Sequence, residues 1–188
     1  MEWYILLQQM INGLALGSIY SLIALGYTMV YGIIKLITFA HGDIYMLGAY
    51  FGIYALTKGG LSLGPALLLS MGLAALVGVV LERIAYRPLR SSPRITALIT
   101  AIGASLFIQS VSQIGFGASF KPFPQAIPFQ RIAIGSVFIT NRQLIMFGVS
   151  IFLMVTLHLI VQYTRIGKAM RAVSMDKEAA MLMGINVD

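Results

Sequence analysis

The chain has 188 residues, of which 59% are hydrophobic and 10% are charged. Because a soluble domain carries about 25% charged residues, this composition excludes a globular protein in water and indicates a membrane protein. The net charge of +7 would suggest nucleic-acid binding in a soluble protein. Here the basic residues stand between apolar blocks, as topogenic charges do, so no nucleic-acid partner is expected. The lack of cysteine excludes disulfides and thiol catalysis.

Five stretches without a charged residue predict five membrane spans. Since a spanning helix needs about 20 apolar residues, four of the stretches can each cross a bilayer. The remaining stretch, 44–57, spans only if the segment from Leu36, with His41 and Asp43, enters the membrane with it. We expect an all-α polytopic membrane protein with a transmembrane domain over 1–163. Its spans are expected near 8–34, 36–57, 60–82, 95–117 and 143–163.

The distribution of Lys and Arg predicts the orientation of these spans. If the segment 83–94 is cytoplasmic, nine basic residues lie inside and four outside, which satisfies the positive-inside rule. The inner residues are Lys35, Arg83, Arg87, Arg90, Arg94, Arg165, Lys168, Arg171 and Lys177, and the outer ones are Lys58, Lys121, Arg131 and Arg142. We therefore expect the N-terminus outside and the C-terminus inside.

The segment 118–142 is expected to form an external loop. It contains Pro122, Pro124 and Pro128, and proline breaks helices. Alternating apolar residues over 131–139 predict a short hairpin within it.

Small residues recur at a spacing of four in three of the expected spans. They are Gly13, Gly17 and Ser21 in the first, Gly48 and Gly52 in the second, and Ala74 and Gly78 in the third. Residues four apart share one helix face, and small side chains let membrane helices approach closely. We interpret these faces as helix-packing surfaces.

The sequence His41-Gly42-Asp43 before the second span has two interpretations. In the favoured one, Gly42 breaks the backbone and Asp43 caps the next helix, which leaves His41 at the interface marked by Lys35. In the other, His41 and Asp43 lie within the membrane, where ionisable residues are functional candidates, and line a translocation path. An intramembrane acid–base enzyme is disfavoured, because residues two apart do not share a helix face.

The final segment, 164–188, is predicted to be an amphipathic cytoplasmic segment rather than a span. Asp176 is placed to cap a short helix and Gly184 to end it. The helix from Lys177 to Met183 would present the small residues Ala179 and Ala180. Such a helix suits docking into a groove on a partner protein.

Four stretches resemble a known family. Glu178-Ala179-Ala180 followed by Gly184 resembles the EAA coupling motif of ABC importer permeases. Gly13–Tyr27, Phe39–Tyr50 and Glu82–Arg90 are similar to the Liv-type permease of branched-chain amino-acid ABC importers, the first of two membrane subunits. Family members continue with further spans after the coupling helix. The chain is therefore expected to be the N-terminal part of such a permease, as a fragment or a truncated product.

The resemblance implies a transport subunit rather than an enzyme, in the cytoplasmic (inner) membrane of a prokaryote. It implies import of leucine, isoleucine or valine, without a cofactor. The implied partners are an external substrate-binding protein, a second permease subunit and two cytosolic ATPase subunits. A permease for urea or short amides is the alternative, because such relatives share the His-Gly-x-x-x-x-Leu-Gly-Ala-Tyr pattern. Two further alternatives are a non-functional truncated fragment and a structural membrane scaffold.

Two groups of residues are the site candidates, and neither is catalytic or metal-binding. The candidates for coupling to the ATPase are Glu178, Ala179, Ala180 and Gly184, with Gly167, Ala169 and Arg171 in the preceding turn. The candidates for the substrate path are Asn12, Tyr20, Tyr27, His41, Asp43 and Tyr45.

Overall fold

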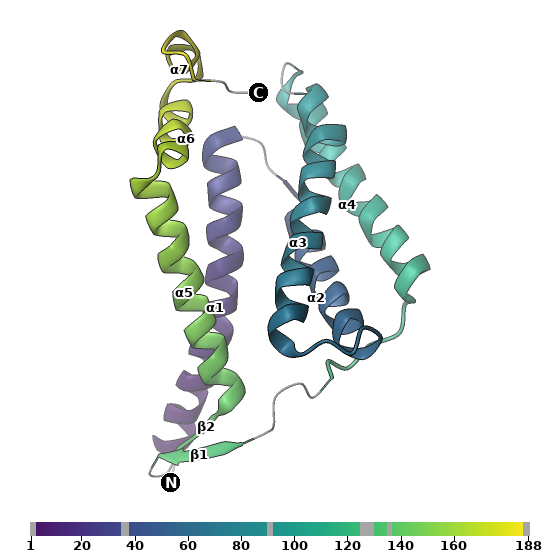
Figure 1. Cartoon of the computed structure of the whole chain (residues 1–188), viewed down its shortest axis with the longest axis vertical. Helices are drawn as coiled ribbons and strands as arrows, with labels where there is room; N and C mark the ends of the chain where they lie inside the picture. The colour runs from purple at the N-terminus through teal and green to yellow at the C-terminus, as the bar shows by residue number, and fades with distance from the viewer. Residues whose placement is uncertain (1–2, 35–37, 90–91, 125–129, 135–136, 186–188) are drawn as a thin grey trace. The chain divides into compact units, whose positions relative to one another are not determined.

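The computed structural model describes residues 3–34, 38–89, 92–124, 130–134 and 137–185, and Figure 1 shows the ribbon. The elements are α1 (Trp3–Ile34), α2 (His41–Thr57), α3 (Leu63–Leu81), the π-helical turn η1 (Glu82–Tyr86), the 3-10 turn η2 (Arg87–Leu89), α4 (Arg94–Phe116), β1 (Arg131–Ile134), β2 (Val137–Thr140), α5 (Asn141–Tyr163), α6 (Arg165–Met175) and α7 (Lys177–Leu182). The expected all-α membrane fold is confirmed. Several positions named above lie outside the described residues, namely Lys35, residues 36–37, Arg90, Pro128 and residues 186–188.

Within the described residues, four helical runs are long and apolar enough to cross a membrane. They are Trp3–Gly32, Leu63–Leu89, Ile95–Phe116 and Asn141–Tyr163. The fifth hydrophobic helix, α2, has 17 residues and is therefore roughly 25 Å long. It is shorter than the hydrocarbon core of a bilayer, which is about 30 Å thick.

The burial pattern differs from that of a soluble protein. Large apolar side chains such as Leu14, Phe107 and Phe152 are 66%, 69% and 68% exposed. Several of the buried side chains are small and polar, among them Ser70 and Ser105. This pattern is expected where the surrounding solvent is lipid and polar groups must bond to other helices.

The described chain divides into two compact units. The first comprises Met1–Lys35 and Ile127–Asp188, and the second comprises Leu36–Ala126. The first unit therefore holds α1, the β hairpin and α5 to α7, whereas the second holds α2, α3 and α4.

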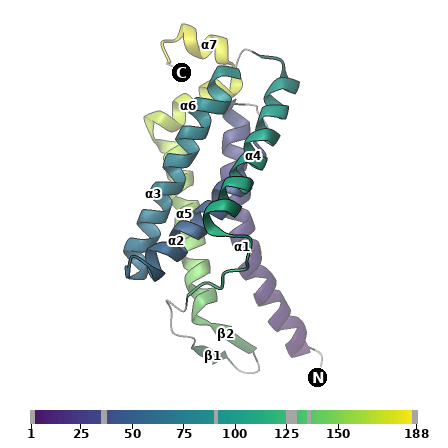
Figure 2. The ribbon, with the colours of Figure 1, turned by 90° about the vertical axis from the view of Figure 1, so that its right-hand side faces the viewer.

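In the first unit, α1 packs along α5. The predicted hairpin is confirmed as an antiparallel pair of β1 and β2, with Arg131 opposite Thr140. It is tied to the start of α1, because the side-chain amide of Gln8 donates to the Phe138 carbonyl at 2.8 Å and accepts from its N–H at 2.9 Å. Figures 1 and 2 show α6 and α7 at the end of this unit opposite the hairpin.

In the second unit, α2 and α3 pack through small residues. A Cβ on Gly48 would lie 3.6 Å from the Ala74 Cβ, and one on Gly52 would lie 3.9 Å from the Ser70 Cβ. The packing interpretation is confirmed for this pair. On α1, a Cβ on Gly13 or Gly17 would meet no described atom within 4 Å, so the packing role of that face stays a prediction.

Candidate functional site

Helix α2 begins part of the way along its two neighbours. Its residue Ile44 lies beside Gly78 of α3, and that helical run continues to Leu89, roughly 15 Å further on. On the other side, Asp43 is bonded to Ser105, the central residue of the 23-residue helix α4. The first turn of α2 is therefore level with the middle of α4.

Asp43 lies at the centre of a polar cluster between α2 and α4. Its carboxylate accepts hydrogen bonds from Ser105 Oγ at 2.5 Å and from Gln109 Nε2 at 3.0 Å. Gln109 Nε2 also lies 3.2 Å from Ser105 Oγ, to which it donates. Asp43 is only 8% exposed, so this carboxylate is held inside the unit by two neutral donors.

The helix-cap interpretation of Asp43 is wrong. Helix α2 starts at His41 with Ala40 as its N-cap residue, and Gly42 and Asp43 belong to its first turn. A carboxylate in the first turn is stabilised by the positive end of the helix, so Asp43 can occupy this position without acting as a cap. The alternative interpretation, in which Asp43 lies within the membrane, agrees with its level on α4.

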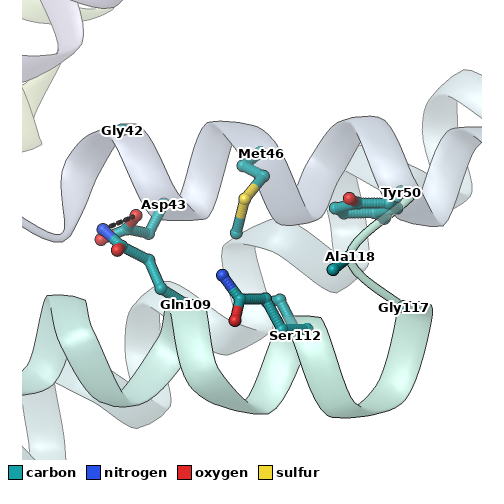
Figure 3. A pocket seen from close by; sticks show the side chains of 9 residues that line it. Gly42, Asp43, Met46, Tyr50, Gln109, Ser112, Gly117 and Ala118 are labelled. Carbon is teal, nitrogen blue, oxygen red and sulfur yellow. Dashed lines mark hydrogen bonds between the residues drawn. The ribbon is translucent and has the colours of Figure 1, made fainter. Parts of the chain in front are cut away.

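A cavity of about 390 Å³ lies between α2 and α4. It is lined by Gly42, Asp43, Met46, Tyr50, Gln109, Ser112, Gln113, Gly117 and Ala118. Figure 3 shows Asp43, Met46 and Tyr50 on the face of α2 that is turned toward Gln109 and Ser112 of α4. The cavity therefore leads from the end of α4 to the carboxylate at its middle.

One wall residue of this cavity has unused hydrogen-bonding capacity. The Oγ of Ser112 is buried and has no hydrogen-bond partner among the described residues, and its side chain is 3% exposed. Leaving a buried polar group unpaired costs about 1–3 kcal/mol. A ligand that reached this hydroxyl would remove that cost.

Aromatic and basic side chains gather at the far end of α2. Tyr50 and Phe116 stack with ring centroids 4.6 Å apart. Lys121 Nζ donates to the Tyr54 hydroxyl at 2.9 Å, and Lys58 Nζ lies 5.0 Å from the centre of the same ring. The two lysines that were assigned to the outer face thus lie at the same end of the second unit.

The other path candidates are not among the residues that line this cavity. Tyr20 and Tyr45 are 68% and 54% exposed, and His41 is half-buried at the first position of α2. Tyr27 stacks on Tyr31 in α1. Asn12 accepts hydrogen bonds from Gln8 at 3.3 Å and Gln143 at 2.8 Å, so it joins α1 to α5.

Sequence reasoning missed the α4 wall of the cavity. Ser105, Gln109 and Ser112 follow one another at spacings of four and three residues within an apolar helix. Residues at these spacings share a face. The polar face that these three residues form on an apolar helix is therefore the sequence pattern from which they could have been predicted.

The coupling candidates in α6 hold this helix against the end of α5. Gly167 N–H donates to Thr164 Oγ1 at 3.0 Å, and Arg171 donates to Gln162 Oε1 at 2.6 Å and to its carbonyl at 3.2 Å. A Cβ on Gly167 would lie 2.2 Å from the Val161 carbonyl oxygen. Only glycine therefore fits at position 167, where the chain turns from α5 into α6. Ala169 is half-buried on the same helix.

The short helix α7 is capped as the sequence predicted. The Asp176 carboxylate accepts from the N–H groups of Glu178 and Ala179 at 2.9 and 3.0 Å. At the other end Gly184 has a φ of 81°, which is the usual conformation for a glycine after a helix. One detail differs: Ala180 is 4% exposed and is packed inward, so Glu178 and Ala179 are the exposed members of the motif.

Comparison with known proteins gave extensive matches. A family model described as a permease component of branched-chain amino acid transport systems matches residues 9–188. The high-affinity branched-chain amino acid transport system permease protein BraD of Pseudomonas aeruginosa is 40% identical over 98% of this chain and 64% of its own. The corresponding permease protein LivH of Escherichia coli K12 is 42% identical over 97% of this chain and 63% of its own. The chain thus spans just under two thirds of these relatives, and no solved structure matches it.

Proposed function

We propose that this chain, which belongs to the permease-component family of branched-chain amino acid transport systems, supplies part of the membrane path for leucine, isoleucine or valine. The observation that carries the proposal is the cavity between α2 and α4, which leads to the buried Asp43. Substrate sites near the middle of the bilayer, beside the end of a helix, are typical of transporters. Helix α2 begins beside the middle of α4, so the cavity lies next to a helix end at the expected depth.

The proposal includes an orientation and a set of partners. The end that carries Lys58 and Lys121 faces outward and receives substrate from an external binding protein. The helices α6 and α7 lie in the cytoplasm and contact one of two ATPase subunits, and a second permease subunit completes the path in the inner membrane. The exposed side chains of Glu178 and Ala179 and the apolar surface of Met181 and Leu182 support this assignment of α7.

The geometry of α6 supports a route for the coupling. A displacement of α7 is transmitted to α6 through Asp176, which is the C-cap residue of α6 and the N-cap residue of α7. From α6 it reaches α5 through the pair of Arg171 and Gln162. In this proposal Gly167 and Arg171 are positioning residues, whereas Glu178 and Ala179 contact the ATPase.

Substrate competition tests the function. The full-length permease, reconstituted with its partner subunits and binding protein, is expected to take up labelled leucine on addition of ATP. Excess isoleucine or valine should suppress the uptake because they share the branched aliphatic side chain, whereas urea should not compete. Suppression by urea or short amides, with no effect of valine, would replace the proposal with the amide permease.

Replacing Gly184 with valine is expected to uncouple the ATPase from substrate. A β-branched residue at a φ of 81° costs roughly 1–2 kcal/mol, which displaces the end of α7. Substrate-stimulated ATP hydrolysis of the reconstituted complex should fall at least about fivefold, with membrane insertion unchanged.

Gly60→Val provides the matched control for Gly184→Val. Gly60 also has a positive φ, of 59°, but it lies in the turn after α2, far along the chain from α7. This variant should keep the stimulation. Wild-type stimulation in Gly184→Val would contradict the assignment of α7.

A further inference from the structure

We propose that Asp43, halfway along α4, binds the ammonium group of the transported amino acid and that Ser112, two turns further along this helix, binds its carboxylate. The inference rests on the proposed function and adds the chemistry by which the path recognises its substrate. It starts from two observations in one cavity: a buried carboxylate with neutral partners, and a buried hydroxyl without a described partner.

The carboxylate of Asp43 has room for further donors. Two carboxylate oxygens offer about four lone-pair sites, and the described hydrogen bonds use one on each oxygen. Both donors, Ser105 Oγ and Gln109 Nε2, are uncharged. A buried charge is costly unless it is paired, and an ammonium group brings both the opposite charge and three donors.

Ser112 supplies the second, independent feature. It lies seven residues after Ser105 and three after Gln109, on the same face of α4, and it lines the cavity. Its hydroxyl can donate to the carboxylate of an amino acid whose ammonium group is bound by Asp43. Gln113, which also lines the cavity, offers an amide donor beside it.

The remaining wall suits an aliphatic side chain. Met46 and Tyr50 line the α2 side of the cavity, as Figure 3 shows. Methionine is unbranched and flexible and adapts to differently shaped apolar groups, such as the side chains of leucine, isoleucine and valine. The volume of about 390 Å³ falls within the range of roughly 300–1,000 Å³ that is usual for small-molecule sites.

Equilibrium binding with two leucine fragments tests the inference. The full-length permease in its complex, in lipid nanodiscs, is titrated with radiolabelled leucine. The competitors are isoamylamine, which lacks the carboxylate, and 4-methylpentanoate, which lacks the amine. For the wild type, isoamylamine should displace leucine at a concentration at least about tenfold lower than 4-methylpentanoate, because its ammonium group pairs with the buried Asp43 carboxylate, whereas 4-methylpentanoate brings a like charge into the same cavity.

Two substitutions then test which residues bind the amino acid. Asp43→Asn should lower leucine affinity at least about tenfold and abolish the preference for the amine, since the isosteric amide keeps the shape and loses the charge. Ser112→Ala should lower leucine affinity roughly fivefold. Ser110→Ala, on the same helix at an exposed position outside the cavity, is the matched control and should bind as the wild type does.

The outcomes separate this inference from the proposed function. Leucine uptake with an unchanged amine preference in Asp43→Asn would overturn the ammonium site alone. If leucine binding required sodium or potassium ions and Asp43→Asn removed that requirement, Asp43 would bind an inorganic cation and the inference would also fail. A complex that takes up no branched-chain amino acid would overturn the proposed function together with the site.

Discussion

Replacing Gly167 with alanine is expected to reduce ATP-driven uptake at least about tenfold while the chain stays inserted in the membrane. The added Cβ would lie 2.2 Å from the carbonyl oxygen of Val161 and 2.4 Å from that of Ile160. Both are backbone atoms of α5, so α6 must move away from them. The cost exceeds the ~1.4 kcal/mol that corresponds to a factor of ten.

The expected movement in Gly167→Ala breaks the contacts that join the two helices. The hydrogen bond from Gly167 N–H to Thr164 and the pair of Arg171 and Gln162 depend on the close approach of α6 to α5. Without them, α7 loses its rigid connection to the membrane helices. Co-purification of the ATPase and transport into proteoliposomes, measured on the same preparation, would report the loss of coupling.

Gly148→Ala is the matched control for Gly167→Ala. Gly148 lies in α5, and an added Cβ there would meet no described atom within 4 Å. This variant should transport within about twofold of the wild type. If Gly167→Ala transported as well as the wild type, the close approach of Gly167 to the end of α5 would not be needed to hold α6 in place.

Replacing Gly48 with leucine is expected to separate α2 from α3 and to destabilise the second unit. The Cβ of an alanine at this position would stand 3.6 Å from the Ala74 Cβ, which is ordinary contact, so Gly48→Ala should be tolerated. The further carbons of leucine have no space between the helices. Overpacking of this kind costs about 1–3 kcal/mol and occasionally more.

The effect of Gly48→Leu should reach the candidate site. Helix α2 carries both Gly48 and Asp43, so a displaced α2 moves the carboxylate away from Ser105 and Gln109. We expect a lower melting temperature and loss of leucine binding, measured by size-exclusion thermostability and by the nanodisc assay.

Gly72→Leu is the control for Gly48→Leu. Gly72 is exposed on α3, with no described atom within 4 Å of an added Cβ. Such a substitution usually changes stability by less than about 0.5 kcal/mol. Equal melting temperatures for Gly48→Leu and Gly72→Leu would refute the proposed contact.

Much of the fold could be predicted because lipid imposes a simple requirement on the sequence. Helices surrounded by hydrocarbon must be apolar along their length, so charge-free stretches locate α1, α3, α4 and α5 to within a few residues. The packing faces of α2 and α3 were predicted from their small residues because close helix contact requires small side chains, whereas the pairing of these two helices was not. The caps of α7 followed from local chemistry at Asp176 and Gly184. The family resemblance is confirmed by the matches over residues 9–188.

The candidate site could be predicted only in part, because its partners are distant in sequence. Asp43 was identified as unusual, but Ser105 follows it by 62 residues, and no local pattern links them. The cap error at Asp43 arose because an acidic residue suits the N-cap and the first turn of a helix alike. The substrate-path and ATPase-coupling residues remain predictions that the substitutions above test.

If the proposed path is correct, the position of Asp43 beside the central residue of α4 lowers the energy barrier of transport. From Ser105, each half of this 23-residue helix is roughly 16 Å long, so a solute bound there has the same thickness of protein ahead of it as behind it. Neither half alone is as thick as the hydrocarbon core of about 30 Å. Two thin layers of protein, one on each side of the bound solute, can therefore open in turn in place of a single thick layer. The solute then crosses only half of the bilayer in each step.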